Sequence, residues 1–257
     1  PIMPLRNTVL FPQQVIPIYI GRGKSLHLIG DLDKGTKKYI VVVAQEDGSI
    51  EDPGKEDLYA YGTLAHVLKV FEMPDNSKSA IVQGISRVKI LDYTKDEPYY
   101  EAAVTQLEEI ELSEDLELDA LSNNLRQSFA DLIKIAPNLT DEHTGMLSNI
   151  QKPNRLADRA ISLMTLSNSE KQEILEELDV KARVEKSIKI ISREIQRIKL
   201  GEEIQTEVHD EIAKTQREYY LREQMKAIKK ELGEDEGTVE LKELEDKIKA
   251  ANMPDDA

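Results

Sequence analysis

The feature that most constrains this chain is the absence of proline between Pro153 and Pro254. Inside this stretch, apolar residues recur at alternating steps of four and three, the spacing of a helix that buries a heptad seam. We therefore predict one helix over Lys181–Leu232, about 75–80 Å long at the usual rise per residue. The first part of its seam consists of Val184, Ile188, Ile191, Ile195 and Ile198.

Gly201 and the polar residues Glu202 and Gln205 interrupt this seam. A rotated stripe then resumes, as a stutter in a heptad pattern would produce, and it stops at Gly233. Its members are Ile204, Val208, Ile212, Leu221, Met225, Ile228 and Leu232. The sequence leaves open whether the helix is continuous at Gly201. A helix of this length exceeds a single globular domain, so we expect it to connect or assemble other parts of the protein.

The whole chain of 257 residues is long enough for about two compact domains. A hydrophobic fraction of 40% can form real cores, and the charged fraction of 32% is above the roughly 25% of average domains, as long solvated helices require. The chain has no cysteine, which excludes disulfides, thiolate metal sites and cysteine nucleophiles and fits a reducing compartment.

No apolar run reaches the roughly 20 residues that span a bilayer, and the chain, which begins with Pro1, has no cleavable leader pattern. The net charge of −15 argues against a general nucleic-acid binder, because phosphate binding needs an excess of Lys and Arg. Residues 181–200 and 214–230 are locally basic, but their apolar residues are spaced for burial. We therefore expect these cations to solvate the helix, and we expect no membrane or nucleic-acid partner.

The first hundred residues are predicted to be rich in β-strands. Val15–Ile20 and Tyr39–Glu46 are β-branched runs of strand length. Between them, a helical apolar spacing runs from Leu26 to a stop at Gly35. Two longer strands flank a Pro-Asp-Asn-Ser turn at residues 74–77. Short strands with one inserted helix favour a small, partly closed barrel.

After Leu112 the pattern becomes helical. The sequence Ser-Glu-Asp at residues 113–115 is typical of a helix N-cap, and apolar residues then recur at helical spacing as far as Ile133. Pro137 and Pro153 separate further helices, so a helical bundle is predicted to follow the β domain.

Gly21–Ser25, with the sequence GRGKS, follows a predicted strand and opens a predicted helix, which is the position of a phosphate-binding loop. The full motif needs a glycine five residues before the glycine of Gly-Lys-Ser, and that position is Ile18. A phosphate-binding loop would be accompanied by an acidic residue directly after an apolar strand. Here Gln45 and Glu46 separate the apolar run from Asp47, so this second motif matches only loosely. We interpret GRGKS as a turn with a cationic helix start and expect no nucleotide site.

No other motif indicates a catalytic or metal centre. The four histidines, which lack metal-ligand spacing, are His27, His66, His143 and His209. No GxSxG motif or Ser-His-Asp set is recognisable. The acidic residues Glu108, Glu109 and Asp256 lie in charge-rich stretches that we expect to be solvated. We expect no catalytic residue, no metal ligand and no cofactor in this chain.

Several segments together resemble the ATP-dependent Lon proteases of the LonA type. The most specific is Gln216–Glu234, QREYYLREQMKAIKKELGE, which is similar to the sequence just ahead of the AAA+ module in that family. The others are MPLRNTVLFPQQVIPIYIGRGKS, DLYAYGTLAHVLKV with QGISRVKIL, and LSNSEKQEILEELDVKARVEK. One departure is Gln13, because the family usually has glycine after LFP.

The resemblance implies an α+β fold in four parts. These are a PUA-like β pseudo-barrel over residues 1–111, a helical bundle over 112–178, a coiled-coil-like neck helix over 179–233, and a linker over 234–257 toward an AAA+ module. It implies a region that captures unfolded or tagged proteins and arranges subunits, without catalysis of its own. The complete subunit would be an ATP- and Mg-dependent Ser-Lys endopeptidase that forms a cytoplasmic homohexamer.

Two groups of residues are candidates for contacts with substrate or with other subunits. Tyr219, Tyr220 and Met225 combine apolar area with polar or adaptable groups, although packing on a neighbouring helix explains them equally well. Leu10 and Phe11, just before Pro12, are candidates for an apolar recognition patch, and a barrel lid or a contact between domains is the slightly favoured alternative. Exposure of this pair would favour recognition.

Two other classes of function stay open. The chain is a free-standing coiled-coil scaffold with a chaperone-like binding domain if translation stops after Ala257, and a downstream nucleotide-binding loop would reject that hypothesis. It is a nucleic-acid or nucleotide binder if the basic helix or GRGKS binds phosphate, which salt-dependent binding would reveal.

Overall fold

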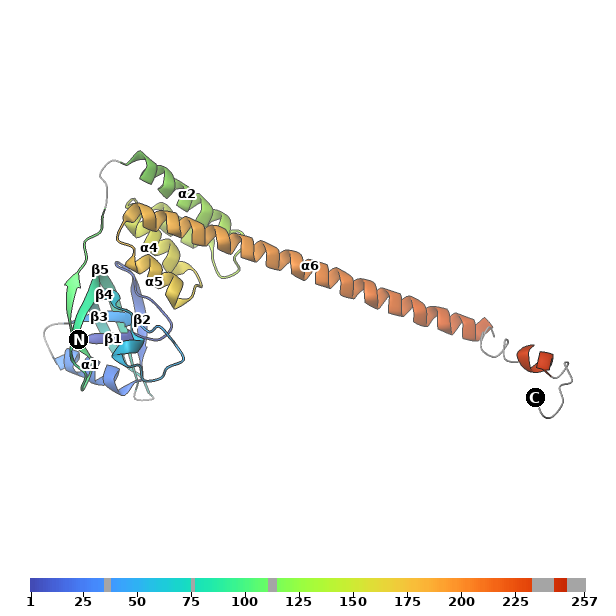
Figure 1. The fold of residues 1–257 in the computed structure, drawn as a ribbon, viewed down its shortest axis with the longest axis horizontal. Helices are drawn as coiled ribbons and strands as arrows, with labels where there is room; N and C mark the ends of the chain where they lie inside the picture. The colour runs from blue at the N-terminus through green and yellow to red at the C-terminus, as the bar shows by residue number, and fades with distance from the viewer. Residues whose placement is uncertain (35–37, 75–76, 111–114, 233–242, 249–257) are drawn as a thin grey trace. The chain divides into compact units, whose positions relative to one another are not determined.

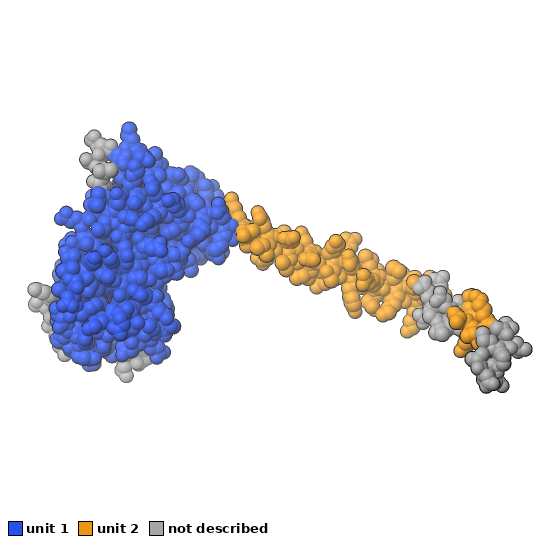
Figure 2. Space-filling model, viewed as in Figure 1, with its two compact units in different colours: residues 1–198 blue, residues 199–257 orange. Residues whose placement is uncertain are grey.

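The computed structural model describes residues 1–34, 38–74, 77–110, 115–232 and 243–248. The chain divides into two compact units, residues 1–198 and residues 199–257 (Figure 2). The first unit combines a six-stranded sheet with several helices, so the predicted α+β class is confirmed. None of the described helices has an apolar stretch that could span a membrane.

A single sheet forms the N-terminal part of the first unit (Figure 1). Its hydrogen-bonded order is β1-β3-β4-β5-β2, and β6 also pairs with β5. The β1–β3 pair is parallel and the other pairs are antiparallel. The strands are β1 (Ile2–Leu5), β2 (Val15–Ile20), β3 (Tyr39–Ala44), β4 (Tyr61–Glu72), β5 (Lys78–Lys95) and β6 (Glu101–Gln106), with a short 3-10 helix η1 (Lys55–Asp57) before β4.

One face of this sheet packs on α1 (Gly23–Lys34), the helix predicted between the strands at Val15–Ile20 and Tyr39–Glu46. Leu28 and Ile29 of α1 are buried against alternate residues of the strands, including Ile18 and Val82. The alternation follows from strand geometry, because successive side chains point to opposite faces. Gly35, the predicted end of this helix, and residues 75–76 of the predicted turn lie outside the described residues.

The turn after the Leu-Phe-Pro sequence brings the chain close to β5. Gln13 has a φ of 64°, a left-handed conformation that glycine adopts at lower cost. Its amide donates to the Gly84 carbonyl at 3.0 Å, and the Gly84 amide donates to the Gln14 carbonyl at 2.9 Å. A Cβ on Gly84 would lie 2.2 Å from the Phe11 carbonyl oxygen, so this approach requires glycine. Gln13, which stands where the Lon family usually has glycine, therefore adopts a backbone conformation that is typical of glycine.

A helical bundle follows the sheet, and local capping explains its boundaries. The N-cap of α2 is Asp115, whose carboxylate accepts from the Glu117 amide, while Ser167 and Glu170 form a capping box before α5. Pro153 opens α4, where its missing N–H is not needed. The bundle helices are α2 (Leu116–Ile133), α3 (Asp141–Ser148), α4 (Pro153–Leu163) and α5 (Asn168–Glu176).

The predicted long helix is confirmed as α6 (Val180–Leu232), an uninterrupted helix of 53 residues that includes Gly201. Its first turns complete the core of the bundle, where Val180, Val184 and Ile191 are fully buried. Ile188, Ile195 and Ile198 pack against the same core and are partly buried. The first part of the heptad seam is thus buried within this chain. The four-part division predicted from the sequence stays a prediction.

Candidate functional site

One face of the sheet leaves apolar side chains uncovered on four neighbouring strands. The register places Tyr39 of β3, His66 of β4, Gln83 of β5 and Val15 of β2 in one row. The next rows hold Lys69, Ile81 and Pro17, and then Phe71, Ser79 and Tyr19. We call the apolar members of these rows the outer face; they are Val15, Pro17, Tyr19, Tyr39, Phe71 and Ile81.

The outer face is exposed because α1 covers the opposite side of the same strands. In β2, Ile18 and Ile20 point into the core, while the side chain of Tyr19 is 66% exposed. Tyr39 is 50% exposed and Phe71 is 39% exposed. The whole chain has only 9 Tyr and 3 Phe, so three exposed aromatic residues on one sheet face are a notable concentration.

Cations and ring contacts organise this outer face. The rings of Tyr39 and His66 stack with their centroids 5.0 Å apart, and Lys69 Nζ lies 4.9 Å from the centre of the Phe71 ring. Stacking and cation–π contacts hold aromatic rings in place by covering part of one ring face, and Tyr39 and Phe71 are still 50% and 39% exposed. The surface can therefore offer apolar contact area to an extended polypeptide.

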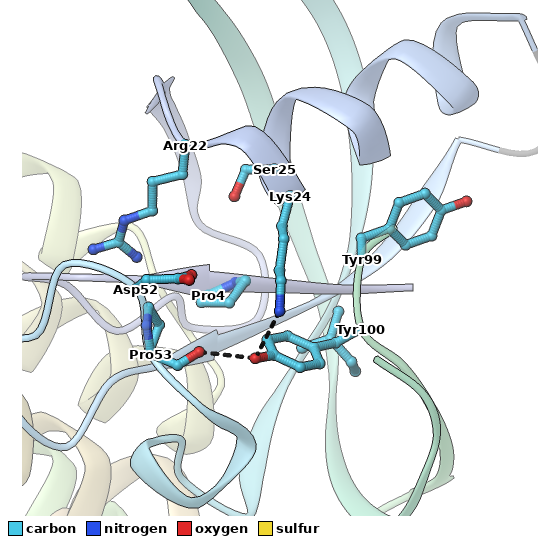
Figure 3. Close-up of a pocket in the computed structure, with 9 residues that line it drawn as sticks. Pro4, Arg22, Lys24, Ser25, Asp52, Pro53, Tyr99 and Tyr100 are labelled. Carbon is cyan, nitrogen blue, oxygen red and sulfur yellow. Dashed lines mark hydrogen bonds between the residues drawn. The ribbon is translucent and has the colours of Figure 1, made fainter. Parts of the chain in front are cut away.

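The GRGKS segment is engaged by its own chain (Figure 3). Lys24 Nζ donates to the hydroxyl of Tyr100 at 3.2 Å, lies 4.4 Å from the centre of that ring, and approaches Glu97 at 3.4 Å. The hydrogen bond to Tyr100 is the main reason that the pKa of Lys24 is raised. The Tyr100 hydroxyl in turn donates to the Pro53 carbonyl at 2.9 Å.

The cavity beside Lys24 has a volume of about 10 Å³, which is close to the space that one water molecule needs. Gly21, Arg22 and Ser25 of the same segment also line a larger cavity of about 500 Å³, so the interpretation of GRGKS as a turn and a helix start stays a prediction.

Four charged side chains join the sheet to the bundle. Arg87 of β5 donates to Glu109 Oε1 at 2.7 Å and to Asp158 Oδ1 at 2.6 Å. Arg183 of α6 donates to the same Glu109 oxygen at 2.6 Å and lies 3.5 Å from Asp158. Both arginines are almost completely buried, and so is Asp158. We call these four residues the charge cluster.

The charge cluster corrects the prediction that Glu109 is solvated. Its side chain is only 24% exposed, because β5, α4 and α6 bring two arginines together around it. Burial alone would raise the pKa of Glu109, but hydrogen bonds from Asn154 and Arg183 and the charges of both arginines outweigh burial and lower this pKa. These partners are far apart in sequence, so no local pattern indicated them. Asp256 lies outside the described residues.

The prediction of a surface patch at Leu10 and Phe11 is wrong. Leu10 is 2% exposed and Phe11 is 1% exposed. Leu10 belongs to the core between the sheet and α1, whereas Phe11 belongs to the core of the bundle. The alternative, a contact between the β domain and the bundle, is correct for Phe11. The physical reason is that the turn at Gln13 folds this segment back between the two parts.

The other predicted contact residues lie in the second unit. Tyr219, Tyr220 and Met225 are 68%, 62% and 59% exposed, and their role stays a prediction. Gln224 Nε2 donates to the Tyr220 hydroxyl at 3.1 Å. Met225 also belongs to the second apolar stripe of α6, which we call the α6 stripe. Its exposed members are Ile204, Val208, Ile212, Leu221, Met225, Ile228 and Leu232.

The histidines make local contacts instead of a common site. His27 Nδ1 lies 2.8 Å from the Gly23 carbonyl oxygen, and His143 Nδ1 accepts from the Thr140 amide at 3.0 Å at the start of α3. Within the described residues, no cluster of three His, Asp or Glu side chains could hold a metal ion.

Comparison with known proteins adds an independent observation. A family model described as the ATP-dependent protease La (LON) substrate-binding domain matches residues 1–193. A Lon protease of Koribacter versatilis is 43% identical over the full length of this chain, which covers 31% of that relative. A Lon protease of Dictyoglomus thermophilum is 38% identical, with coverage of 100% and 32%. The chain thus spans about a third of the length of the curated relatives it matches.

Solved structures agree with the fold. The N-terminal domain of a Mycobacterium avium complex Lon protease superposes with a TM-score of 0.61 at 22% identity, covering 75% of this chain and 97% of that one. A Lon N-terminal domain protein from Xanthomonas campestris superposes with a TM-score of 0.52 at 18% identity, covering 72% of this chain and 94% of that one.

Proposed function

This chain belongs to the family of the Lon protease substrate-binding domain, and from that premise we propose that its outer face captures exposed apolar segments of unfolded or tagged proteins. The observation that carries this proposal is the exposure of Tyr39 in one row of the register and of Phe71 and Tyr19 in another, on one face of the four neighbouring strands β3, β4, β5 and β2. Unfolded chains expose apolar side chains that folded proteins bury. Contact with such a face removes apolar area from water, at roughly 25 cal/mol per Å².

We propose further that this region delivers the captured segments to a motor and protease encoded beyond this chain. The complete subunit would use ATP and Mg and a Ser-Lys active site, and it would act in the cytoplasm as a homohexamer. The region itself would take no cofactor, carry no catalysis and bind no nucleic acid. Tyr219, Tyr220 and Met225 would contact neighbouring subunits or the threading polypeptide.

The experiment measures binding of a permanently unfolded, fluorescently labelled protein to the full 257-residue chain. The double substitution Tyr39→Ser and Phe71→Ser removes two exposed rings without opening the core. We expect it to weaken binding at least fivefold, about 1 kcal/mol, because ring contacts of this kind contribute about that much.

The matched control is Leu91→Ser, which removes an apolar side chain that is 63% exposed on β5 but lies outside the outer face. It should leave the affinity unchanged. Equal weakening by the control and the double variant would contradict a specific face. Hydrolysis of ATP or peptide by the purified chain at enzymatic rates would contradict a purely recognising role.

A further inference from the structure

A cavity lies where the outer face meets the helical bundle. It has a volume of about 400 Å³, and the turn before β2 lines it together with residues of α4. Val15 belongs to the outer face and also lines this cavity, and its side chain is 49% exposed. The outer face therefore adjoins the cavity. We call it the joint cavity; the lining residues that matter here are Pro12, Val15, Ile150, Arg155 and Arg159.

Two arginines of α4 line the joint cavity without a carboxylate partner. Arg155 and Arg159 are four residues apart, so they lie on the same side of the helix. Among the described residues, neither side chain forms an ion pair, and Arg159 Nη2 lies 3.6 Å from the Met146 sulfur, a weak acceptor. Asp158 also lines the cavity, but it is 4% exposed and its carboxylate is held by the two arginines of the charge cluster.

The unpaired guanidinium groups favour an anionic ligand. Like charges four residues apart on a helix repel each other, and a carboxylate between Arg155 and Arg159 would replace this repulsion with attraction. A guanidinium presents planar N–H donors whose spacing matches the two oxygens of a carboxylate. The net charge of the whole chain is −15, so only local cations such as these can attract an acidic group to the surface.

The outer face leads to these arginines along β2. Tyr19, Pro17 and Val15 alternate on its outer side and span about 13 Å at the usual rise per residue. Pro12 and Ile150 add apolar area to the walls of the joint cavity. An extended polypeptide on this path would contact apolar surface first and would reach the guanidinium groups about four or five residues later.

We propose that the joint cavity is a specificity subsite of the outer face, which binds the carboxylate of a Glu or Asp side chain in an extended polypeptide. Arg155 and Arg159 hold this carboxylate, while the apolar residues of the same polypeptide contact β2. The two arginines thereby select apolar segments that carry an acidic residue about four or five positions away. The inference rests on the proposed function, whose site it extends, and it names the class of segment that this site prefers.

The test measures fluorescence anisotropy of two labelled peptides with the full 257-residue chain. Both peptides contain the same apolar segment and spacer, and one ends the spacer with glutamate where the other has glutamine. Each pair is made in both orders, since an extended chain can run along β2 in either direction. The glutamate peptide should bind at least about fivefold more tightly in one order, as expected for hydrogen bonds to a charged group. Added salt should reduce this preference, because Arg155 is exposed.

The double substitution Arg155→Gln with Arg159→Gln should abolish the preference and leave the affinity for the glutamine peptide unchanged. A loss of packing alone would weaken both peptides equally. The matched control is Arg217→Gln with Arg222→Gln, which removes the same charge from exposed positions in the second unit and should keep the preference. Thermal unfolding checks that both variants fold, and the salt dependence of the unmodified chain tests the proposal without any variant.

Equal binding of the glutamate and glutamine peptides in both orders overturns the proposal, and so does an equal loss of preference in the two arginine variants. A lower mass of the Arg155→Gln, Arg159→Gln variant in light scattering, with no preference in the unmodified chain, would assign the joint cavity to a second copy of this chain.

Tyr39→Ser with Phe71→Ser separates this inference from the proposed function, because neither residue lines the joint cavity. This variant should weaken both peptides alike and keep the preference for glutamate. A preference for glutamate without any effect of the ring substitutions would contradict only the outer face. An effect of the ring substitutions without a preference would contradict only the joint cavity.

Discussion

At the scale of single residues, Arg87 connects the sheet to the bundle through three acceptors. Its Nε donates to the Leu175 carbonyl at 2.8 Å, and its two other nitrogens donate to Glu109 and Asp158. The residue is 3% exposed, so water cannot replace these bonds. A planar guanidinium can meet three acceptors at once, which a lysine cannot do with the same geometry.

We predict that Arg87→Met lowers the free energy of unfolding by about 3–5 kcal/mol, because it leaves the buried carboxylate of Asp158 without its main partner. Urea unfolding measures this change. Lys95→Met is the control, since Lys95 pairs with Glu101 at 3.6 Å near the surface, and such pairs contribute about 1 kcal/mol or less. Equal losses in the two variants would show that the charge cluster does not stabilise the fold.

Glu109 makes the stability of the first unit dependent on pH. Its pKa in the folded chain is lower than the ordinary value of 4.5, so below that value the unfolded chain binds more protons than the folded chain. The stabilisation is therefore complete above pH 4.5 and is lost as the pH falls through the lowered pKa. We predict a smaller loss of stability between pH 5 and pH 3 in Glu109→Gln than in the unmodified chain. A constant difference across urea titrations at these pH values would contradict the prediction.

At the scale of elements, β2 and α6 each have two roles. Alternate residues of β2 contribute Ile18 and Ile20 to the core and Tyr19 to the outer face. The helix α6 divides along its length: Val184 and Ile191 complete the bundle, while Ile204 and Ile212 are 53% exposed. In both elements the apolar residues recur at regular spacing. Their burial differs because other elements of the protein cover only some of them.

At the scale of the whole molecule, the α6 stripe is an apolar surface that the described residues of this chain leave uncovered. A helix with apolar residues at heptad spacing is stabilised in water when a second helix packs on that stripe and buries it. No described residue of the chain covers Ile204, Val208 or Ile212, which are 50–53% exposed. This agrees with the proposed role of the long helix in subunit assembly.

We predict that Ile204→Glu with Ile212→Glu lowers the mass measured by light scattering toward that of the monomer, 29.1 kDa. The midpoint of thermal unfolding of the first unit should stay the same, because both residues lie in the second unit. Gln205→Glu with Gln216→Glu is the control, since it adds the same charge at exposed positions off the stripe. An unchanged mass in the stripe variant, or an equal drop in the control, would contradict the prediction.

Features that depend on neighbours along the chain follow from the amino-acid sequence alone. The spacing of apolar residues predicted α6 to within one residue at its start, and β-branched runs predicted β2 with its observed bounds. Local strings also carried the resemblance to the Lon family, which the match over residues 1–193 confirmed.

Which apolar and charged residues are covered depends on contacts between elements that are distant in the sequence. Phe11 and Tyr19 are both apolar residues near the start of the chain, yet one is 1% and the other 66% exposed. The charge-rich sequence around Glu109 predicts a solvated side chain, but in the structure Arg87 of β5 and Arg183 of α6 lie beside it. Periodicity reveals that a face is apolar, whereas burial depends on which distant element packs on that face. This is why the long helix and the family could be predicted, and the contact surfaces could not.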